Sequence, residues 1–455
     1  MTDPHNPVAS PSIEAPWPTA ARGWWAVGVF CFIAVLSYSD RQILTLLVDP
    51  IRADLHVSDM QIGLLQGAAF AFIYAVAGVA LGRAADVLPR RRVIVAGVLI
   101  WSAATIACGY AASFAGLFAA RAAVGIGEAA LAPAAMSIIT DSFPAHRRGA
   151  GTGAFLMGMI MGSGVALALG GALLQLAEAG ALRSLPIIGA LAPWRACLVI
   201  LGLAGLPIVL LAATVREPRR RQIGAGAAQP SRISRALGQL ASRWRILLPL
   251  YTAMGLNSLC DFAVLNWAPA MLTRRFHTSV AEIGGVLGGA VIAGGVVGSI
   301  GAGVVGDLMV RRGGGASRLR LAVFALILGS LATLLVLAPN PPVAFALAGL
   351  WIFASSTGQT VGITVVQEIA PADARGLSIS IASLVNIGIG LALGAALPAL
   401  VMAYVLKSAT AVGAGITLVA LPCTLVSVGL YGLTLRNARR IGATFDQPSN
   451  AIAAP

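Results

Sequence analysis

Charged residues are scarce in this chain of 455 residues: only 11% are Asp, Glu, Lys or Arg, whereas 58% are hydrophobic. Soluble globular proteins carry about 25% charged residues, so the composition excludes an ordinary soluble domain and indicates a membrane protein. The apolar runs are roughly 20 residues long, which is typical of membrane-spanning helices. Strands of a membrane β-barrel are about half that length and alternate in polarity, so a barrel is excluded.

Residues that usually carry catalysis or bind metals are few and dispersed. The four histidines all lie outside the apolar runs, and the five cysteines form no C-x-x-C pair. The sequence has no G-x-S-x-G nucleophile motif and no P-loop for ATP. We therefore expect no enzyme activity, no metal and no cofactor. Any proton relay inside the membrane has to use carboxylates, because no histidine lies there.

Positive charge prevails over negative charge, and the formal net charge is +14. When both termini are placed in the cytoplasm, most of the 31 Lys and Arg residues fall in cytoplasmic segments, and the densest group lies between Arg216 and Arg245. This asymmetry follows the positive-inside rule and sets the orientation. The excess of Lys and Arg therefore reflects the orientation of the chain in the cell inner membrane, and no nucleic-acid partner is expected.

Twelve apolar runs are long enough to span a bilayer. They cover residues 22–48, 60–86, 93–113, 116–141, 149–176, 194–215, 246–272, 281–309, 319–339, 343–368, 377–405 and 409–435. Residues 1–21 are rich in proline and have no apolar core, so we expect no cleaved signal peptide. Residues 177–193 fit either an outer loop or an extension of the fifth helix.

Two polar connections recur in the second half of the chain. Gly82, Asp86, Arg90 and Arg91 recur as Gly303, Asp307, Arg311 and Arg312, and Asp141, Pro144, Arg148 and Gly149 recur as Glu368, Pro371, Arg375 and Gly376. Parallel six-helix repeats are typical of transporters that rock about a site near the middle of the membrane. The predicted parts are a cytoplasmic tail (1–21), a six-helix bundle (22–215), a basic cytoplasmic linker (216–245), a second six-helix bundle (246–435) and a cytoplasmic tail (436–455).

The connection "GRAADVLPRRR" resembles the loop motif of the major facilitator superfamily, Gly-x-x-x-Asp-x-x-x-Arg-Arg, and the resemblance covers residues 22–435. Five further stretches are similar to the Spinster branch: "SYSDRQIL", "SDMQIGLLQ", "RAAVGIGEAALAP", "APWR" and "NWAPAML". The resemblance implies an all-α membrane fold of two pseudo-symmetric six-helix bundles. It also implies proton-linked transport of lysophospholipids or sphingoid lipids by alternating access.

The fifth apolar run carries part of the antiporter signature of the superfamily. Gly153, Gly162, Gly170 and Gly171 match its spacing, but Ala-Leu replaces the central Gly-Pro. Small residues also permit close packing of neighbouring membrane helices. The pattern therefore favours antiport only slightly, and close helix packing explains it at least as well.

Five ionisable residues lie well inside the apolar runs, where a charge costs about 2.5–3.5 kcal/mol at the bilayer centre. They are Asp40, Arg41, Arg121, Glu128 and Asp261. Arg121 and Glu128 are seven residues apart, which places them on one helix face about 10 Å apart, so they cannot easily pair with each other. The resemblance implies that the first and fourth helices line the central cavity. The expected pairs are therefore Asp40 with Arg121 and Glu128 with Arg41.

Two interpretations of these pairs remain open. They are either fixed ion pairs that lock the helices together or sites of proton coupling and substrate binding. Buried ion pairs stabilise proteins weakly compared with apolar packing, and carboxylates inside the membrane are the usual proton sites of transporters. We favour a switch in which protonation of Asp40 or Glu128 frees Arg41 or Arg121 to bind a phosphate or carboxylate head group.

Other polar residues are weaker candidates. Those for the substrate cavity are Tyr74, Asn257, Asp261, Gln359 and Asn386, although isolated polar residues in membrane helices more often form interhelical hydrogen bonds. Those for a cytoplasmic gate are Gly82, Asp86, Arg90, Arg91, Asp307 and Arg311, with the positive-inside signal as the alternative.

The spans are rich in Gly and Ala, and the fifth contains Met157, Met159 and Met161, which favours a wide, adaptable and apolar cavity with a few charges near its centre. Such a cavity suits an amphipathic, anionic lipid better than a sugar. Small organic anions or drugs are the alternative substrates, and a membrane enzyme or a sensor is the alternative class of protein. We expect a monomer surrounded by membrane lipids, with protons as the coupling ion.

Overall fold

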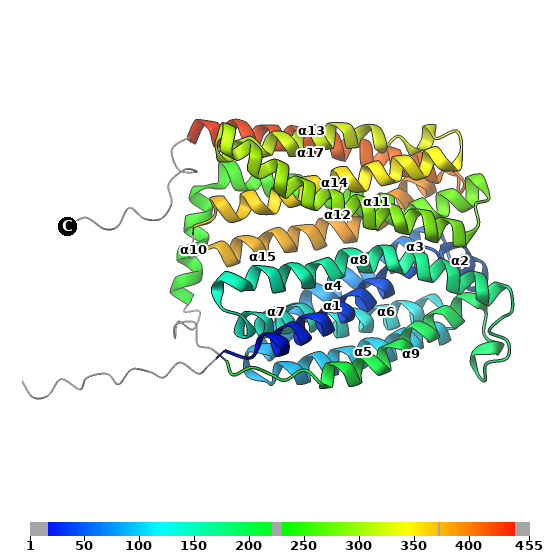
Figure 1. Cartoon of the computed structure of the whole chain (residues 1–455). Helices are drawn as coiled ribbons and strands as arrows, with labels where there is room; N and C mark the ends of the chain where they lie inside the picture. Colours follow the sequence, from blue (N-terminus) through cyan, green and yellow to red (C-terminus); the bar gives the residue numbers. More distant parts are fainter. Residues whose placement is uncertain (1–16, 221–229, 372–373, 442–455) are drawn as a thin grey trace, which may run out of the picture.

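The computed structural model describes residues 17–220, 230–371 and 374–441. Within these ranges, twelve helical segments are long and apolar enough to cross a membrane, which confirms the predicted all-α membrane fold. They lie side by side in one bundle (Figure 1). The spans are Ala20–Ile43, Asp59–Val87, Arg90–Tyr110, Phe114–Ser142, Arg147–Glu178, Pro193–Ala213, Trp244–Phe276, Val280–Gly313, Arg318–Leu337, Pro341–Ile369, Arg375–Leu406 and Val412–Arg440.

The helices of the first half pack against one another. They are α1 (Ala20–Ile43), α2 (Val48–Leu55), α3 (Asp59–Gln66), α4 (Ala68–Val87), α5 (Arg90–Tyr110), α6 (Phe114–Glu128), α7 (Leu131–Ser142), α8 (Ala145–Glu178) and α9 (Pro193–Ala213). The most extensive contacts join α1 to α8 and α5 to both α6 and α9. In Figure 1 this half forms the lower part of the bundle.

The second half repeats this organisation. Its helices are α11 (Trp244–Phe276), α12 (Val280–Gly313), α13 (Arg318–Ala332), α14 (Pro341–Ile369), α15 (Arg375–Val385), α16 (Ala392–Leu400) and α17 (Val412–Ile441). Two π-helical segments, Asn386–Leu391 and Val401–Leu406, connect α15 to α16 and extend α16. The largest contacts here join α11 to α17 and α14 to both α12 and α13.

A short helix, α10 (Pro230–Ser242), separates the halves and crosses one end of the bundle (Figure 1). We call this the α10 end and the opposite one, which carries α2, the α2 end. Ala236 and Leu240 of α10 are buried and lie four residues apart, so they form one docking stripe. The sequence predicted only a polar linker over 216–245, because this helix is too short and too basic for a membrane span.

The two halves meet mainly through α8 against α12 and α3 against α16. Glycines allow these helices to approach closely. A Cβ atom on Gly164 would lie only 2.3 Å from a side-chain atom of Ile292, and one on Gly171 would lie 2.6 Å from the carbonyl oxygen of Val280. Of the glycines that match the antiporter spacing, Gly171 packs between the halves, whereas Gly162 and Gly170 pack against the first span and its end in the same half.

Several helix ends differ from the predicted spans. The first predicted span, 22–48, continues too far: α1 ends at Ile43, and the polar α2 begins at Val48 after a turn. Residues 177–193 form a loop rather than an extended helix, since α8 ends at Glu178 and a 3-10 turn at Ile188–Ala190 precedes α9. The last helix continues to Ile441, so residues 436–441 of the predicted tail are helical.

Candidate functional site

The first charge pair joins α1 to α6. Arg41 Nε donates to Oε2 of Glu128 over 2.6 Å, and Ser37 Oγ donates to the same oxygen over 2.8 Å. The Glu128 side chain is fully buried, whereas 18% of the Arg41 side chain is exposed. The preceding residue, Gly127, lets α5 and α6 touch, since a Cβ there would lie 2.6 Å from the backbone nitrogen of Trp101. This close approach keeps the carboxylate inside the bundle.

Three aromatic rings surround the Arg41 guanidinium. Its central carbon lies 4.3 Å from the ring centre of Phe70 and 4.8 Å from those of Tyr38 and Tyr74. Phe70 and Tyr74 are one turn apart on α4 and stack at 5.2 Å. Cation–π contacts of this kind contribute about 0.5–2 kcal/mol each. They hold the guanidinium in place independently of its carboxylate partner.

The second charge pair lies deeper. Arg121 Nη1 on α6 is 3.4 Å from Oδ2 of Asp40, and Thr105 Oγ1 of α5 donates to the same oxygen over 3.0 Å. Both charged side chains are only 2% exposed. The structure therefore contains both of the pairs expected from the sequence. Oδ1 of Asp40 and Oε1 of Glu128 are buried and have no hydrogen-bond partner among the described residues, so each carboxylate keeps one oxygen free for a proton.

A cavity of about 450 Å³ lies between the two halves. Its polar lining from the first half is Tyr38, Arg41, Gln42, Gln66, Arg121 and Ser163, and that from the second half is Ser258, Asp261, Asn266, Ser356, Gln359 and Asn386. Apolar side chains, among them Phe70, Met159, Phe262 and Leu265, supply the rest. Within the described part of the chain, the two carboxylates that pair with the arginines are not lining residues. The arginines therefore face the cavity, and their carboxylates lie behind them.

The weaker cavity candidates divide into two groups. Asp261, Gln359 and Asn386 line the cavity; Gln359 donates to the carbonyl oxygen of Met254, and Asn386 accepts from Ser258. Asn257 and Tyr74 do not line it. Asn257 is fully buried and donates to the backbone oxygen of Ser355, so its amide ties α11 to α14. Tyr74 packs against the Arg41 guanidinium instead.

The predicted gate residues at the α10 end make contacts within the first half. Arg90 is buried and binds Asp141 and Glu217, and its Nη2 donates to the carbonyl oxygen of Pro218 over 2.9 Å. Partial burial acts to raise the pKa of Glu217, but hydrogen bonds from Arg90 outweigh it and hold the pKa below its usual value. Arg91 is exposed and lies 3.4 Å from the carbonyl oxygen of Ala213.

The remaining gate candidates are solvent-facing or paired locally. The side chain of Asp86 is 69% exposed and lies 4.0 Å from Arg83, one turn away. Asp307 pairs with Arg318, which also binds Glu368. Gly82 has open space beside it, and Arg311 is exposed. No ion pair at this end, within the described ranges, joins residues before 221 to residues after 229.

At the α2 end an ion pair does join the halves. Arg274 of α11 donates to both oxygens of Asp59 on α3 over 2.8 and 3.0 Å, and to Asp49 of α2 over 2.8 Å. The Arg274 side chain is 8% exposed. We call Arg274, Asp49 and Asp59 the outer clamp. The structure therefore represents a state that is closed at the α2 end and has no matching ion pair at the α10 end among the described residues.

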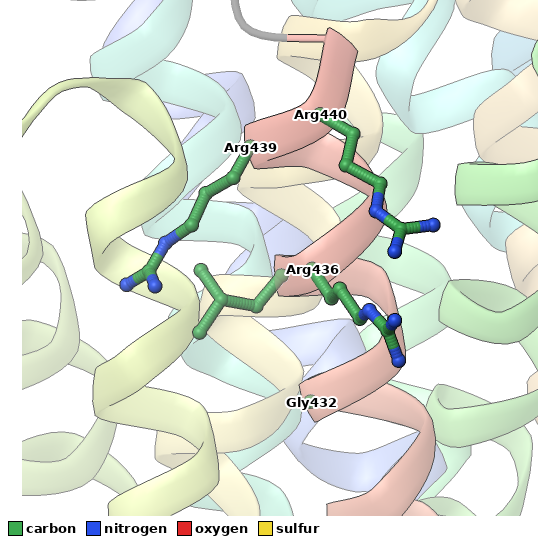
Figure 2. Close-up of a pocket in the computed structure, with 5 residues that line it drawn as sticks. Gly432, Arg436, Arg439 and Arg440 are labelled. Carbon is green, nitrogen blue, oxygen red and sulfur yellow. The ribbon is translucent and has the colours of Figure 1, made fainter.

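A second cavity, of about 380 Å³, lies at the α10 end of α17 (Figure 2). Gly432, Leu435, Arg436, Arg439 and Arg440 line it. Figure 2 shows the guanidinium of Arg439 on one side of the helix and those of Arg436 and Arg440 on the other. One helix supplies all five residues, so this hollow is a surface feature away from the interface between the halves. The central cavity is therefore the candidate transport site.

Sequence reasoning missed five residues of the central site. The sequence did not single out Phe70 and Tyr38, because an aromatic residue in an apolar span usually packs against other apolar side chains. Gln42 and Gln66 were passed over because they lie near the ends of their spans, and Asn266 was passed over beside the stronger candidate Asp261. The available signal was that Tyr38, Arg41 and Gln42 fall on adjacent faces of one turn of α1.

Twelve spans in two halves around a central charged cavity are the arrangement typical of membrane transporters. The family model of the Major Facilitator Superfamily matches residues 30–395, and the chain belongs to that superfamily, whose members are transporters and not enzymes.

The curated relatives point to two branches. The chain is 30% identical over 298 residues to an MFS-type efflux pump of Mycolicibacterium smegmatis, a match that covers 64% of this chain and 63% of the pump. It is 31% identical over 200 residues to the protein spinster of Drosophila melanogaster, which covers 43% of this chain and 33% of spinster. The chain thus spans less than two thirds of either relative.

A solved structure shows the same fold. A bacterial homologue of the human lysosomal transporter Spinster, in an inward-facing and unoccupied conformation, superposes with a TM-score of 0.77 at 23% identity, over 95% of this chain and 100% of that one. The predicted superfamily and the predicted resemblance to Spinster proteins are therefore confirmed.

Proposed function

We propose that this transporter moves an amphipathic, anionic lipid of the lysophospholipid or sphingoid-phosphate type, coupled to protons through Asp40 and Glu128. Arg41 and Arg121 hold the head group. The α10 end faces the cytoplasm of the inner membrane, because the arginine-rich connections gather there. The protein acts as a monomer with its two halves rocking about the central cavity.

The observation that best supports this proposal is the arrangement of the charged side chains around the cavity. The arginines line the cavity, whereas the carboxylates that bind them lie behind, away from the substrate space. An anionic head group can therefore reach Arg41 without first displacing Glu128 from the cavity. The surrounding Phe70, Phe262 and Leu265 offer an apolar surface for an acyl chain.

Protonation changes what the arginine can bind. An ionised Glu128 occupies Arg41 Nε, and this charge-assisted hydrogen bond weakens when the carboxylate takes up a proton. The aromatic rings keep the guanidinium in position, so it presents its donors to a phosphate in a bidentate manner. Proton uptake and head-group binding are thereby linked through one residue.

The test uses Glu128→Gln in proteoliposomes. The amide keeps the shape and the contact with Ser37 but cannot titrate. We expect flux of lysophospholipid driven by a pH gradient to be abolished, while ligand binding measured by thermal shift persists. The matched control is Glu282→Gln, an exposed carboxylate at the start of α12, which should leave pH-driven flux unchanged.

Two results would contradict the proposal. Unchanged pH dependence of flux in Glu128→Gln would remove this residue as the proton site. A thermal-shift screen in which only small hydrophilic anions stabilise the protein would exclude a lipid substrate.

A second candidate function is export of drugs or small organic anions with the same proton coupling. It is favoured by the likeness to the mycobacterial efflux pump, which covers more of this chain than the likeness to spinster does. The same screen separates the two, since an efflux pump for drugs should be stabilised by apolar cations or neutral drugs as well as by anions.

A further inference from the structure

Three buried amide side chains line the central cavity and belong to neither charge pair. They are Gln42 at the end of α1, Gln66 at the end of α3 and Asn266 on α11. Their exposed fractions are 6%, 7% and 4%. Nε2 of Gln42, both polar atoms of Gln66 and Nδ2 of Asn266 have no hydrogen-bond partner among the described residues.

These amides lie at one level beneath the outer clamp. Gln66 follows Asp59 by seven residues on α3, a rise of about 10 Å, and Asn266 precedes Arg274 by eight residues on α11, a rise of about 12 Å. Asp59 and Arg274 are bonded to each other, so Gln66 and Asn266 are at similar depth on opposite halves. Gln42 directly follows Arg41 in α1, so the three amides lie near the Arg41 guanidinium.

A buried amide without a partner carries a desolvation cost, and most buried polar groups in native proteins are hydrogen-bonded. Gln359 shows the ordinary arrangement in the same cavity, because its amide donates to the carbonyl oxygen of Met254. Three unpartnered amides on three helices therefore indicate a site that a ligand completes. An amide offers both donors and an acceptor without charge, so it can donate to the oxygen of a hydroxyl group and accept from its hydrogen.

We infer that Gln42, Gln66 and Asn266 form a subsite for the free hydroxyl that lies next to the anionic group of the transported lipid. This inference rests on the proposed function, since Arg41 must hold the anionic group. The subsite spans both halves, so a hydroxyl bound there links α3 to α11 directly below the outer clamp. It would then discriminate hydroxyl-bearing lipids from simple alkyl anions that Arg41 alone would accept.

The experiment compares two probes on the purified full chain in nanodiscs. One is a lysophosphatidate with a free hydroxyl, and the other is a monoalkyl phosphate of equal chain length without one. For the wild type we expect the lysophosphatidate to bind about three- to tenfold more tightly, as one or two additional hydrogen bonds allow. Gln66→Met, which keeps the side-chain shape, should abolish that advantage while leaving the affinity for the alkyl phosphate unchanged.

Asn266→Leu is the second variant and should have the same selective effect, so the inference does not depend on the folding of one substitution. Ser380→Ala is the matched control, because the exposed hydroxyl of Ser380 donates to the carbonyl oxygen of Gly376 in its own helix; this variant should keep the full preference. Equal binding of the two probes by the wild type, or equal weakening of both by Gln66→Met, overturns the hydroxyl subsite alone. Failure of both probes to bind the wild type overturns the anionic-lipid proposal itself.

Discussion

The outer clamp offers a direct test of how the closed state is held. Arg274→Met removes the guanidinium but retains an unbranched side chain of similar length, so the packing of α11 changes little. The substitution leaves Asp49 and Asp59 without their partner from the second half. We expect the α2 end to open in a large fraction of the molecules.

The magnitude follows from the bonds that are lost. Arg274 makes two hydrogen bonds to Asp59 and one to Asp49, all charge-assisted and all at 2.8–3.0 Å. A hydrogen bond to a charged group contributes about 1.5–3 kcal/mol, but partial exposure of Asp49 and the cost of desolvating the arginine offset part of the sum. A net effect of about 2–4 kcal/mol shifts the equilibrium between closed and open states by about 30- to 1,000-fold.

Spin labels placed at Ala53 and His277, exposed positions on the two halves near the clamp, report this shift by pulsed electron paramagnetic resonance. Arg274→Met should transfer population from the short to the long distance. The control is Arg275→Met, since Arg275 donates to the carbonyl oxygen of Val336 in its own half and stacks on Phe276. A distance distribution identical in both variants would refute the clamp.

Three further substitutions test other parts of the molecule. Asp40→Ala leaves Arg121 buried and unpaired, so denaturant unfolding should show a loss of about 3–5 kcal/mol, and adding Arg121→Leu should restore most of it; additive losses would contradict the pairing. Asp86→Asn should slow substrate exchange at unchanged affinity, because Asp86 is exposed in this state; a weakened Kd would argue against a gate. Glu217→Gln should lower the Tm at pH 7, because the depressed pKa of Glu217 means that its ionised form stabilises the fold. That contribution is lost as the pH falls below about 4.3 towards the depressed value, so the difference from wild type should vanish there; a constant difference would refute the ion pair with Arg90.

The charge pairs were predictable because ionisable residues are expensive in a membrane and must find partners. Arg121 and Glu128 lie about 10 Å apart along one face of their helix, which excludes their mutual pairing. The resemblance to the superfamily then placed the first helix opposite the fourth, so each residue was expected to find its partner on α1. The repeated loop motif located the two halves for a similar reason, since polar residues between apolar spans are conspicuous.

The outer clamp and the three unpaired cavity amides were not predictable from the same signals. Arg274 and Asp59 are 215 residues apart and lie at the ends of apolar spans, where charged residues are ordinary. Gln66 and Asn266 look like interhelical hydrogen bonders until the fold shows that neither has a partner among the described residues. Their role depends on how α3 and α11 lie relative to each other in space. The residue pattern of a single helix does not reveal this arrangement.

The second copy of the gate motif does not make the ion pairs that the sequence repeat suggests. The repeat places Arg311 where Arg90 lies, yet in the second half Arg318 takes the carboxylates of Asp307 and Glu368. A residue outside the repeated motif has therefore replaced the motif arginine in this state. The exposed Asp86 and Arg311 remain available for contacts in a state closed at the α10 end.

The two charge pairs are unequal in a way that bears on proton coupling. Asp40 and Arg121 are each 2% exposed, and their charged atoms are 3.4 Å apart, so water and substrate have little access to them. In the other pair, 18% of Arg41 is exposed to the cavity, while its aromatic cage holds it whether or not Glu128 is charged. The pair of Arg41 with Glu128 can therefore exchange a carboxylate for a head group without opening the protein interior. We expect Glu128 to exchange its proton in the state seen here, and Asp40 to exchange its proton with Arg121 only when the halves move and give water access to that deeper pair.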